Sequence, residues 1–278
     1  MKVLQSPQAA RQWCLHSGSP RVLVPTMGAL HEGHAALIRR AKRMAGREGS
    51  VVVSLFVNPT QFGPTEDFEA YPKPLASDLA LCREAGADLV FHPAASQMYA
   101  GDHSTTIKES SLTTVLCGKS RPGHFDGVCT IVAKLFLILT PTHAVFGEKD
   151  WQQLAILRRM VRDLGFSVKI QSVAIVRERD GLALSSRNSY LTPSERAVAS
   201  KICEALRTSA SLPSPVTICR QARERLEKIS GARVDYVEAV DAKTLAPLRD
   251  RSRPGRLAAA VFLGKARLID NVPLSVLP

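Results

Sequence analysis

The chain has 278 residues, which is enough for one large domain or for two modest ones. Hydrophobic residues make up 45% of it, yet no apolar stretch reaches the roughly eighteen residues of a membrane span. The net charge of +12 favours anionic ligands, but aromatic residues are only 5% and the arginines are dispersed. This composition favours acidic small molecules over nucleic acid. Six cysteines without a C-x-x-C pair, and an N-terminus without a secretory apolar region, predict reduced thiols and a cytoplasmic location.

Short apolar runs alternate with helical patterns through the first two-thirds of the chain. The predicted strands are 22–24, 51–57, 89–91, 144–146 and 168–176, and the predicted helices are 35–45, 75–85, 126–139 and 150–163. This alternation predicts an α/β fold in which residues 1–176 form a Rossmann-like parallel sheet domain covered by helices on both faces. A smaller α+β C-terminal domain is predicted for residues 177–278, with helices near 193–209 and 216–229 and strands near 234–240 and 257–263.

The most informative segment is residues 25–34 (PTMGALHEGH), which follows the first strand of the central series and leads into a helix. Its glycines allow the backbone to approach a ligand closely, and a helix N-terminus offers unpaired N–H groups to an anion. His31 and His34 are three residues apart, so they share one helix face and can point at one phosphate chain. The zinc-protease spacing of four residues is absent, and the competing interpretation is a pair of surface histidines near a turn.

Two further polar clusters follow predicted strands. Residues 58–62 (NPTQF) come after the strand 51–57, and residues 147–150 (GEKD) come after the strand 144–146. Because ligands bind at the carboxyl ends of parallel strands, we expect these clusters and the 25–34 motif at one edge of the sheet. Lys149 can neutralise phosphate or carboxylate charge, although a solvated charged turn would look the same in the sequence.

Other side chains fit the same kind of ligand. Ser185, Ser186 and Arg187 combine hydroxyl groups with a guanidinium that can grip a triphosphate, unless they belong to an ordinary loop. Gln61 and Gln153 are neutral amides beside apolar neighbours, so they can hydrogen-bond a small polar substrate or merely satisfy backbone groups. The sequence therefore predicts nucleotide binding with charge stabilisation at a phosphate, and it leaves both roles open for the two glutamines.

Several segments together resemble one protein family, the pantothenate synthetases (pantoate–β-alanine ligases), which belong to the wider H-x-G-H nucleotidyltransferase superfamily. The segments that carry the resemblance are 25–34, 58–62, 123–128, 147–153, 180–188 and 267–271. The resemblance implies that pantoate attacks ATP to give pantoyl adenylate and pyrophosphate, and that β-alanine then displaces AMP to form pantothenate. It also implies Mg²⁺ on the phosphates, a homodimer, and no nucleic-acid or membrane partner.

The resemblance also implies a role for each matching residue. The residues that it makes catalytic are His31, His34, Lys149 and Arg187. The residues that it places around ATP are Met27, His34, Gly147, Lys149, Asp150, Val176, Leu184, Ser185, Ser186 and Arg187, with the ribose held by Asp150 and the Gly147 backbone. It assigns pantoate to Gln61 and Gln153, the phosphates and the incoming amine to the neighbourhood of Asn58, and Mg²⁺ to the neighbourhood of Asp78.

Two other functions remain open from the sequence. A nucleotidyltransferase acting on another small substrate would use the same histidine element, and it would release pyrophosphate without amine-dependent formation of AMP. A basic nucleic-acid-binding protein with a synthetase-like fold would show steeply salt-dependent oligonucleotide binding. The neutral Gln61 and Gln153 favour the ligase, because a nucleic-acid binder would be expected to carry Lys or Arg there.

Overall fold

The structure is a computed structural model, and it describes residues 1–64 and 66–277. The chain folds into two compact units. The N-terminal unit comprises Met1–Ser110, Arg121–Glu148 and Ile156–Ala174, and the C-terminal unit comprises Ser111–Ser120, Lys149–Ala155 and Ile175–Pro278. The last division falls beside the predicted boundary at residue 176, but the segments Ser111–Ser120 and Lys149–Ala155 group with the C-terminal unit although they precede that boundary.

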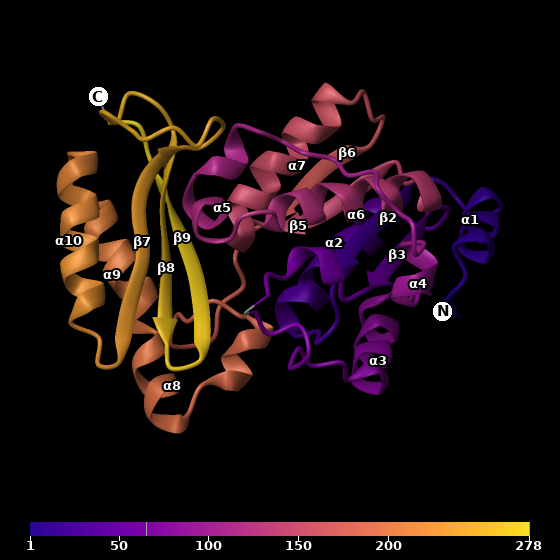
Figure 1. Ribbon diagram of the computed structural model, residues 1–278, viewed down its shortest axis with the longest axis horizontal. Coiled ribbons are helices and arrows are strands. Elements are labelled where there is room, and N and C mark those ends of the chain that lie inside the picture. Colours follow the sequence, from indigo (N-terminus) through magenta and orange to yellow (C-terminus); the bar gives the residue numbers. More distant parts are fainter. Residues whose placement is uncertain (65, 278) are drawn as a thin grey trace. The chain divides into compact units, whose positions relative to one another are not determined.

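A parallel sheet forms the centre of the N-terminal unit. In the described residues it has six strands in the order β1-β4-β3-β2-β5-β6. Figure 1 labels four of them, β2, β3, β5 and β6. The strands are β1 (Lys2–Leu4), β2 (Arg21–Thr26), β3 (Ser50–Leu55), β4 (Leu89–Phe91), β5 (His143–Gly147) and β6 (Lys169–Val173), and all pairs are parallel. The chain runs outward from β2 through β3 to β4 and resumes with β5 on the other side of β2. This confirms the predicted Rossmann-like sheet, and the reversal point where such sheets bind ligands lies between β2 and β5.

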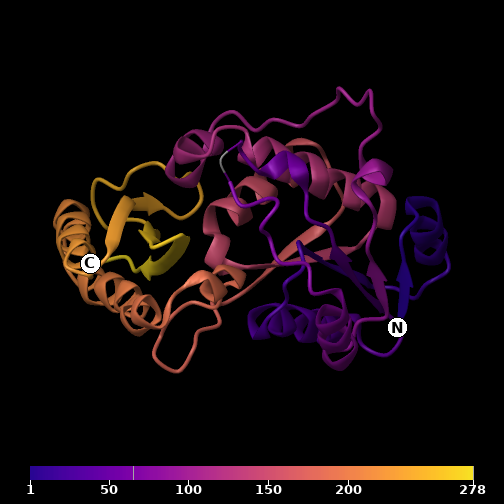
Figure 2. The same cartoon turned by 60° about the horizontal axis from the view of Figure 1, so that its bottom comes forward.

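Helices cover both faces of this sheet. They are α1 (Pro7–Leu15), α2 (Glu32–Ala45), α3 (Leu75–Ala85), α4 (Ala95–Met98), α6 (His124–Leu139) and α7 (Trp151–Asp163), whose first turn groups with the C-terminal unit. Val22 and Val24 belong to one buried cluster with Ile38 of α2 and Cys82 of α3, and Leu23 faces the opposite side because strand side chains alternate. Figure 2 shows α2 and α3 on one face and α6 on the other. Within the described residues, none of these or the other helices is long and apolar enough to cross a bilayer.

The C-terminal unit is built on an antiparallel sheet of β7 (Ala232–Asp241), β8 (Gly255–Leu263) and β9 (Ala266–Leu274). Helices α9 (Lys201–Ala210) and α10 (Pro215–Glu227) pack against it around a core that includes Leu206, Leu226 and Leu257 (Figure 1). The helix predicted over 193–209 is divided at Ser200 into α8 (Pro193–Ala199) and α9, and β9 was not predicted as a strand. Short helical turns complete the unit at η2 (Leu112–Thr114), α5 (Leu116–Ser120) and η4 (Ser186–Tyr190).

Candidate active site

The loop between β2 and α2, which carries the predicted phosphate-binding motif, has left-handed backbone at two consecutive residues. Gly28 has a φ of +89° and Ala29 a φ of +50°. A Cβ atom at residue 28 would lie 3.1 Å from Oδ2 of Asp78, so glycine here satisfies both the positive φ and a close contact. The main chain of this loop therefore takes a specific shape immediately before the two histidines.

His31 and His34 are fixed by hydrogen bonds at the start of α2. His31 is the N-cap, and its Nδ1 accepts the N–H of Gly33 at 3.1 Å. Nδ1 of His34 accepts the N–H of His31 at 3.3 Å, and the two ring centroids lie 4.1 Å apart. A ring nitrogen that accepts a hydrogen bond is unprotonated, so each neutral imidazole carries its proton on Nε2. The helix start thus holds two N–H donors side by side, in a position that favours an anion.

Asp78, in the first turn of α3, stabilises the same loop through its carboxylate. Its Oδ2 accepts the N–H of Ala29 at 2.9 Å, and its Oδ1 accepts the N–H of Leu30 at 2.7 Å. The residue is only 3% exposed, and burial raises the pKa of the Asp78 carboxyl more than the two N–H donors lower it. Mg²⁺ was predicted in the neighbourhood of Asp78, and this stays a prediction; in the structure each carboxylate oxygen accepts one N–H of the loop. Within residues 1–64 and 66–277, no group of three or more His, Cys, Asp or Glu could hold a metal ion.

Asn58, after β3, is completely buried and uses its whole amide within the protein. Its Nδ2 donates to Oε1 of Gln61 at 3.0 Å and to the carbonyl of Gly127 at 3.1 Å. Its Oδ1 accepts the hydroxyl of Tyr99 at 2.8 Å and that of Thr60 at 3.0 Å. These bonds fix the orientation of the Gln61 amide in η1 (Pro59–Gln61): Oε1 faces Asn58, and Nε2 remains the group with N–H donors to offer.

The main chain at Gln61 is held by a second network, which explains the 123–128 motif. His124 donates from Nδ1 to the Gln61 carbonyl at 2.8 Å, and Arg121 donates to Nε2 of His124 at 3.0 Å. Arg121 also forms two 2.6 Å hydrogen bonds with the carboxylate of Glu66. Burial raises the pKa of Glu66, but the Arg121 guanidinium outweighs this effect and leaves the pKa lowered. At Gly127, an added Cβ would lie 2.4 Å from the carbonyl oxygen of Thr60, so α6 and η1 can approach this closely only with glycine.

In the C-terminal unit, residues 176–188 form a short hairpin followed by η4. The N–H of Leu184 donates to the Val176 carbonyl at 3.0 Å, and Arg177 and Ala183 form an antiparallel β-bridge between the two arms of the hairpin. Oγ of Ser185 then caps η4 by accepting the N–H of Arg187 at 3.3 Å. The predicted triphosphate-binding residues therefore occupy an ordered turn.

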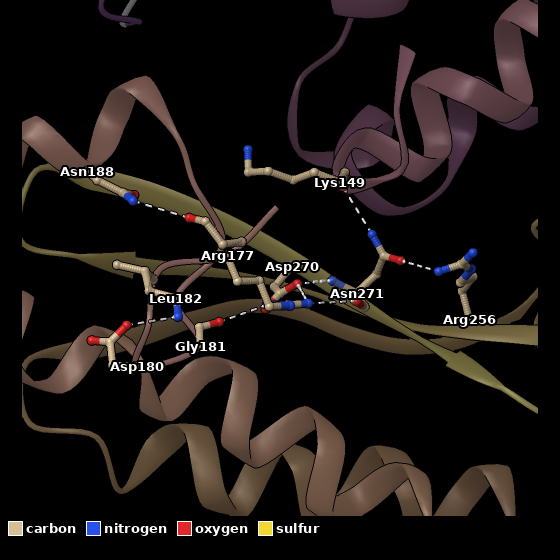
Figure 3. Close-up of polar contacts among 10 residues, drawn as sticks. Lys149, Arg177, Asp180, Gly181, Leu182, Asn188, Arg256, Asp270 and Asn271 are labelled. Carbon is tan, nitrogen blue, oxygen red and sulfur yellow. Dashed lines mark hydrogen bonds and ion pairs between the residues drawn. The ribbon is translucent and has the colours of Figure 1, made fainter. Parts of the chain in front are cut away.

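Lys149 lies beside this turn within the same unit. Lys149, Ala183, Ser185 and Asp270 contribute to the lining of one small hollow, whose apolar part includes Leu182, Ile202 and Leu268. Nζ of Lys149 makes no hydrogen bond or ion pair with any described residue, whereas its carbonyl accepts the amide Nδ2 of Asn271 at 3.0 Å. Figure 3 shows the Lys149 side chain extending away from Asn271.

The predicted site residues are distributed over both units. The N-terminal unit contains Met27, His31, His34, Asn58, Gln61, Asp78 and Gly147, and the C-terminal unit contains Lys149, Asp150, Gln153, Val176, Leu184, Ser185, Ser186 and Arg187. The structure brings His31 together with His34, Asn58 with Gln61, and Lys149 with Ser185. Their roles toward ligands stay predictions. The contacts of Tyr99, Arg121 and Asn271 were not predicted, although the 123–128 and 267–271 motifs marked two of those regions.

Comparison with known proteins gives one consistent family. A family model described as pantoate-beta-alanine ligase matches residues 2–273. A pantothenate synthetase from Akkermansia muciniphila is 49% identical over 257 residues, which cover 91% of this chain and 92% of the relative. A pantothenate synthetase from Sphingopyxis alaskensis is 51% identical over 261 residues and covers 92% of each chain.

Solved structures show the same similarity in three dimensions. The crystal structure of pantothenate synthetase from Thermus thermophilus has a TM-score of 0.93 at 44% identity and covers 99% of this chain and 100% of that chain. A pantoate-beta-alanine ligase from Francisella tularensis, complexed with beta-gamma ATP and beta-alanine, has a TM-score of 0.82 at 33% identity and covers 98% and 97%. The similarity thus includes the residues of both units.

Proposed function

Since this chain belongs to the pantoate-beta-alanine ligase family, we propose that it condenses pantoate with β-alanine at the expense of ATP. In the first step a carboxylate oxygen of pantoate attacks the α-phosphorus of ATP. A new O–P bond forms, the bond to the β-phosphate oxygen breaks, and pyrophosphate leaves. In the second step the amine nitrogen of β-alanine attacks the acyl carbon of the adenylate and loses a proton, and AMP leaves as pantothenate forms.

The observation that carries this proposal is the pair of imidazoles at the start of α2. The first step brings an anionic carboxylate to an anionic phosphate, so donors that stabilise the phosphate oxygens lower the barrier. His31 and His34 carry Nε2–H groups that suit this task, and they follow the strand at the reversal point of the sheet. Removing one such preorganised donor typically lowers kcat by about 10²–10³-fold.

Lys149 supplies the mobile positive charge in the proposed site. Its Nζ has no partner among the described residues, so the ammonium can follow the carboxylate and the α-phosphate as the bond between them forms. The other residues that we assign to ATP are Met27, Gly147, Asp150, Val176, Leu184, Ser185, Ser186 and Arg187. Lys149 and Ser185 line one small hollow, so these two members of the set lie close together.

Gln61 and Gln153 are assigned to pantoate. Asn58 holds Oε1 of Gln61, so the Gln61 amide presents N–H donors, which match the carboxylate and hydroxyl oxygens of pantoate. Asn58 was predicted to lie by the phosphates and the amine. Because its own amide is fully engaged, we assign it the role of orienting Gln61.

Mg²⁺ is implied by the use of ATP, and a protein ligand for it stays a prediction. Both oxygens of Asp78 accept backbone N–H groups, and the part of the chain that the structure describes has no cluster of three acidic, His or Cys residues suited to a metal. The steps proposed above use the chain's own residues, and we propose that Mg²⁺ enters with ATP as part of the substrate.

The proposal is tested by measuring AMP and pyrophosphate with ATP and pantoate, with and without β-alanine. We expect AMP release to depend on β-alanine. AMP release that ignores β-alanine would refute the ligase, and pyrophosphate release without amine-dependent AMP would indicate a nucleotidyltransferase with another substrate. Tight, steeply salt-dependent oligonucleotide binding without catalysis would instead support the nucleic-acid-binding alternative. The homodimer and the cytoplasmic location stay predictions, and sedimentation of the same preparation tests the first.

A further inference from the structure

Asn271 in β9 contacts two other segments of the C-terminal unit and its neighbour Asp270, although only 3% of its surface is exposed. Its Nδ2 donates to the carbonyl of Lys149 at 3.0 Å, and its Oδ1 accepts from the Arg256 guanidinium at 3.1 Å. Its own N–H donates to Oδ1 of Asp270 at 2.7 Å (Figure 3). The amide is thus oriented at both ends, and its donor end is directed at the main chain of Lys149.

The segment that contains Lys149 is also held at Trp151, two residues later. The Arg256 guanidinium lies 3.7 Å from the ring centroid of Trp151, a distance at which cation–π attraction is significant. Nε1 of Trp151 donates to the carbonyl of Ala242 at 3.1 Å. Residues 149–151 are therefore attached to the C-terminal sheet through Asn271 on one side and through Trp151 on the other.

Asp270 extends this arrangement to the hairpin that precedes Ser185. Its carboxylate forms hydrogen bonds of 2.7 and 2.8 Å with the Arg177 guanidinium, which also donates to the Gly181 carbonyl at 3.0 Å. The side chains of Arg177 and Asp270 are only 13% and 4% exposed, so the pair is little screened by solvent. Residues 270 and 271 thus connect the Lys149 main chain with the hairpin that leads to Ser185.

We propose that Asn271 is a positioning residue: it fixes the main chain at Lys149, and thereby the position from which the Lys149 ammonium reaches the substrates. The inference rests on the proposed function for the role of Lys149. Nζ of Lys149 has no partner among the described residues, so its starting position depends on where the main chain at residue 149 is held. A displacement of about 1 Å at a catalytic group can reduce the rate by roughly 10²-fold. Asn271 acts through Lys149 and does not itself need to touch the substrates.

The first test is a double-mutant comparison of the adenylation step, measured by pyrophosphate exchange. We expect Asn271→Ala to lower kcat by about 10²-fold while changing the KM for ATP much less. In a Lys149→Ala background, the same substitution should cause little further loss, because the group that it positions is already gone. An equal loss in both backgrounds would overturn the inference, since Asn271 would then act independently of Lys149.

A second variant covers the possibility that Asn271→Ala does not fold. Arg256→Met keeps the apolar stem of the side chain but removes both the donor to Asn271 and the cation over Trp151, which together hold residues 149–151, and we expect a smaller loss in the same direction. Arg253→Met is the matched control, because Arg253 is an exposed arginine on the approach to β8. Equal effects of the two arginine substitutions would contradict the proposed role of Asn271.

Hydrogen exchange provides a readout that does not need activity. We expect Asn271→Ala to speed exchange in a peptide covering residues 148–155, while a peptide covering β3 exchanges at its original rate. If the wild-type protein forms no AMP in response to β-alanine, the proposed function fails. The exchange measurement then still tests whether Asn271 holds the main chain at Lys149. If the wild-type protein is active and neither exchange nor kcat responds to Asn271→Ala, the inference alone fails.

Discussion

Replacing Asn58 with Asp should reverse the hydrogen-bonding polarity of the proposed pantoate pocket. The two side chains have nearly the same shape, but a carboxylate cannot donate to Oε1 of Gln61 or to the Gly127 carbonyl. Gln61 can satisfy a carboxylate at residue 58 only by turning its Nε2 toward it. Oε1 would then face the substrate, and an oxygen acceptor would meet the carboxylate of pantoate.

The size of the expected rise in the KM for pantoate follows from the loss of one hydrogen bond, the one that the Gln61 amide is proposed to donate to the pantoate carboxylate. A hydrogen bond to a charged group contributes about 1.5–3 kcal/mol, and 1.4 kcal/mol corresponds to about tenfold in an equilibrium constant. We therefore expect the KM for pantoate to rise by roughly 10–150-fold, with little change in the KM for ATP.

The assay is pyrophosphate exchange with pantoate and ATP varied in turn, accompanied by thermal unfolding. The matched control is Thr60→Val, which removes one of two donors to Oδ1 of Asn58 and leaves the hydroxyl of Tyr99 in place. Because Thr60 is exposed, we expect a change of no more than about twofold. Equal rises in both KM values, or an unchanged KM for pantoate in Asn58→Asp, would refute the assigned orientation of Gln61.

Two further predictions concern a histidine and a carboxylate of the N-terminal unit. His34→Ala should lower adenylation by at least about 100-fold and cost about 1 kcal/mol of stability through the lost cap; near-normal pyrophosphate exchange would exclude His34 from catalysis. The lowered pKa of Glu66 contributes stability that is present above its ordinary value of 4.5 and is lost as the pH falls through the folded-state pKa. Urea unfolding between pH 7 and pH 3.5 should therefore show the advantage of the wild type over Glu66→Gln shrinking below pH 4.5, and an advantage independent of pH would contradict the Arg121–Glu66 contact.

The centre of the fold and the histidine element could be predicted from the sequence because their signals are local. A buried parallel strand reads as a short apolar run, and the 25–34 motif follows such a run directly. The sequence of β9 does not read as a buried strand, because Asp270 and Asn271 interrupt its apolar pattern. Both residues are buried only because Arg177 and the Lys149 carbonyl compensate them from distant parts of the chain.

The hydrogen bonds of Asp78 to the loop before α2 could not be predicted from the sequence either, because they also join residues that are far apart in the chain. Its carboxylate accepts from Leu30, 48 residues away, and nothing near residue 78 marks that contact. Asn58 could be recognised as a candidate site residue, but its engagement with Tyr99 and Gly127 depends on how η1 meets α6. Short-range patterns therefore located the candidate site, whereas the direction of each polar side chain required the folded chain.

The division of the C-terminal unit into three segments has a consequence for how the protein is made. Ser111–Ser120 and Lys149–Ala155 leave the ribosome before any of the strands on which they settle has been synthesised. Cys117, for example, contacts the hydroxyl of Tyr236, which is 119 positions further along the chain. A fragment beginning at residue 177 would lack both segments, so we expect it to expose surface that they normally cover. During synthesis the Lys149 carbonyl can accept its hydrogen bond from Asn271 only after a further 122 residues have been added to the chain.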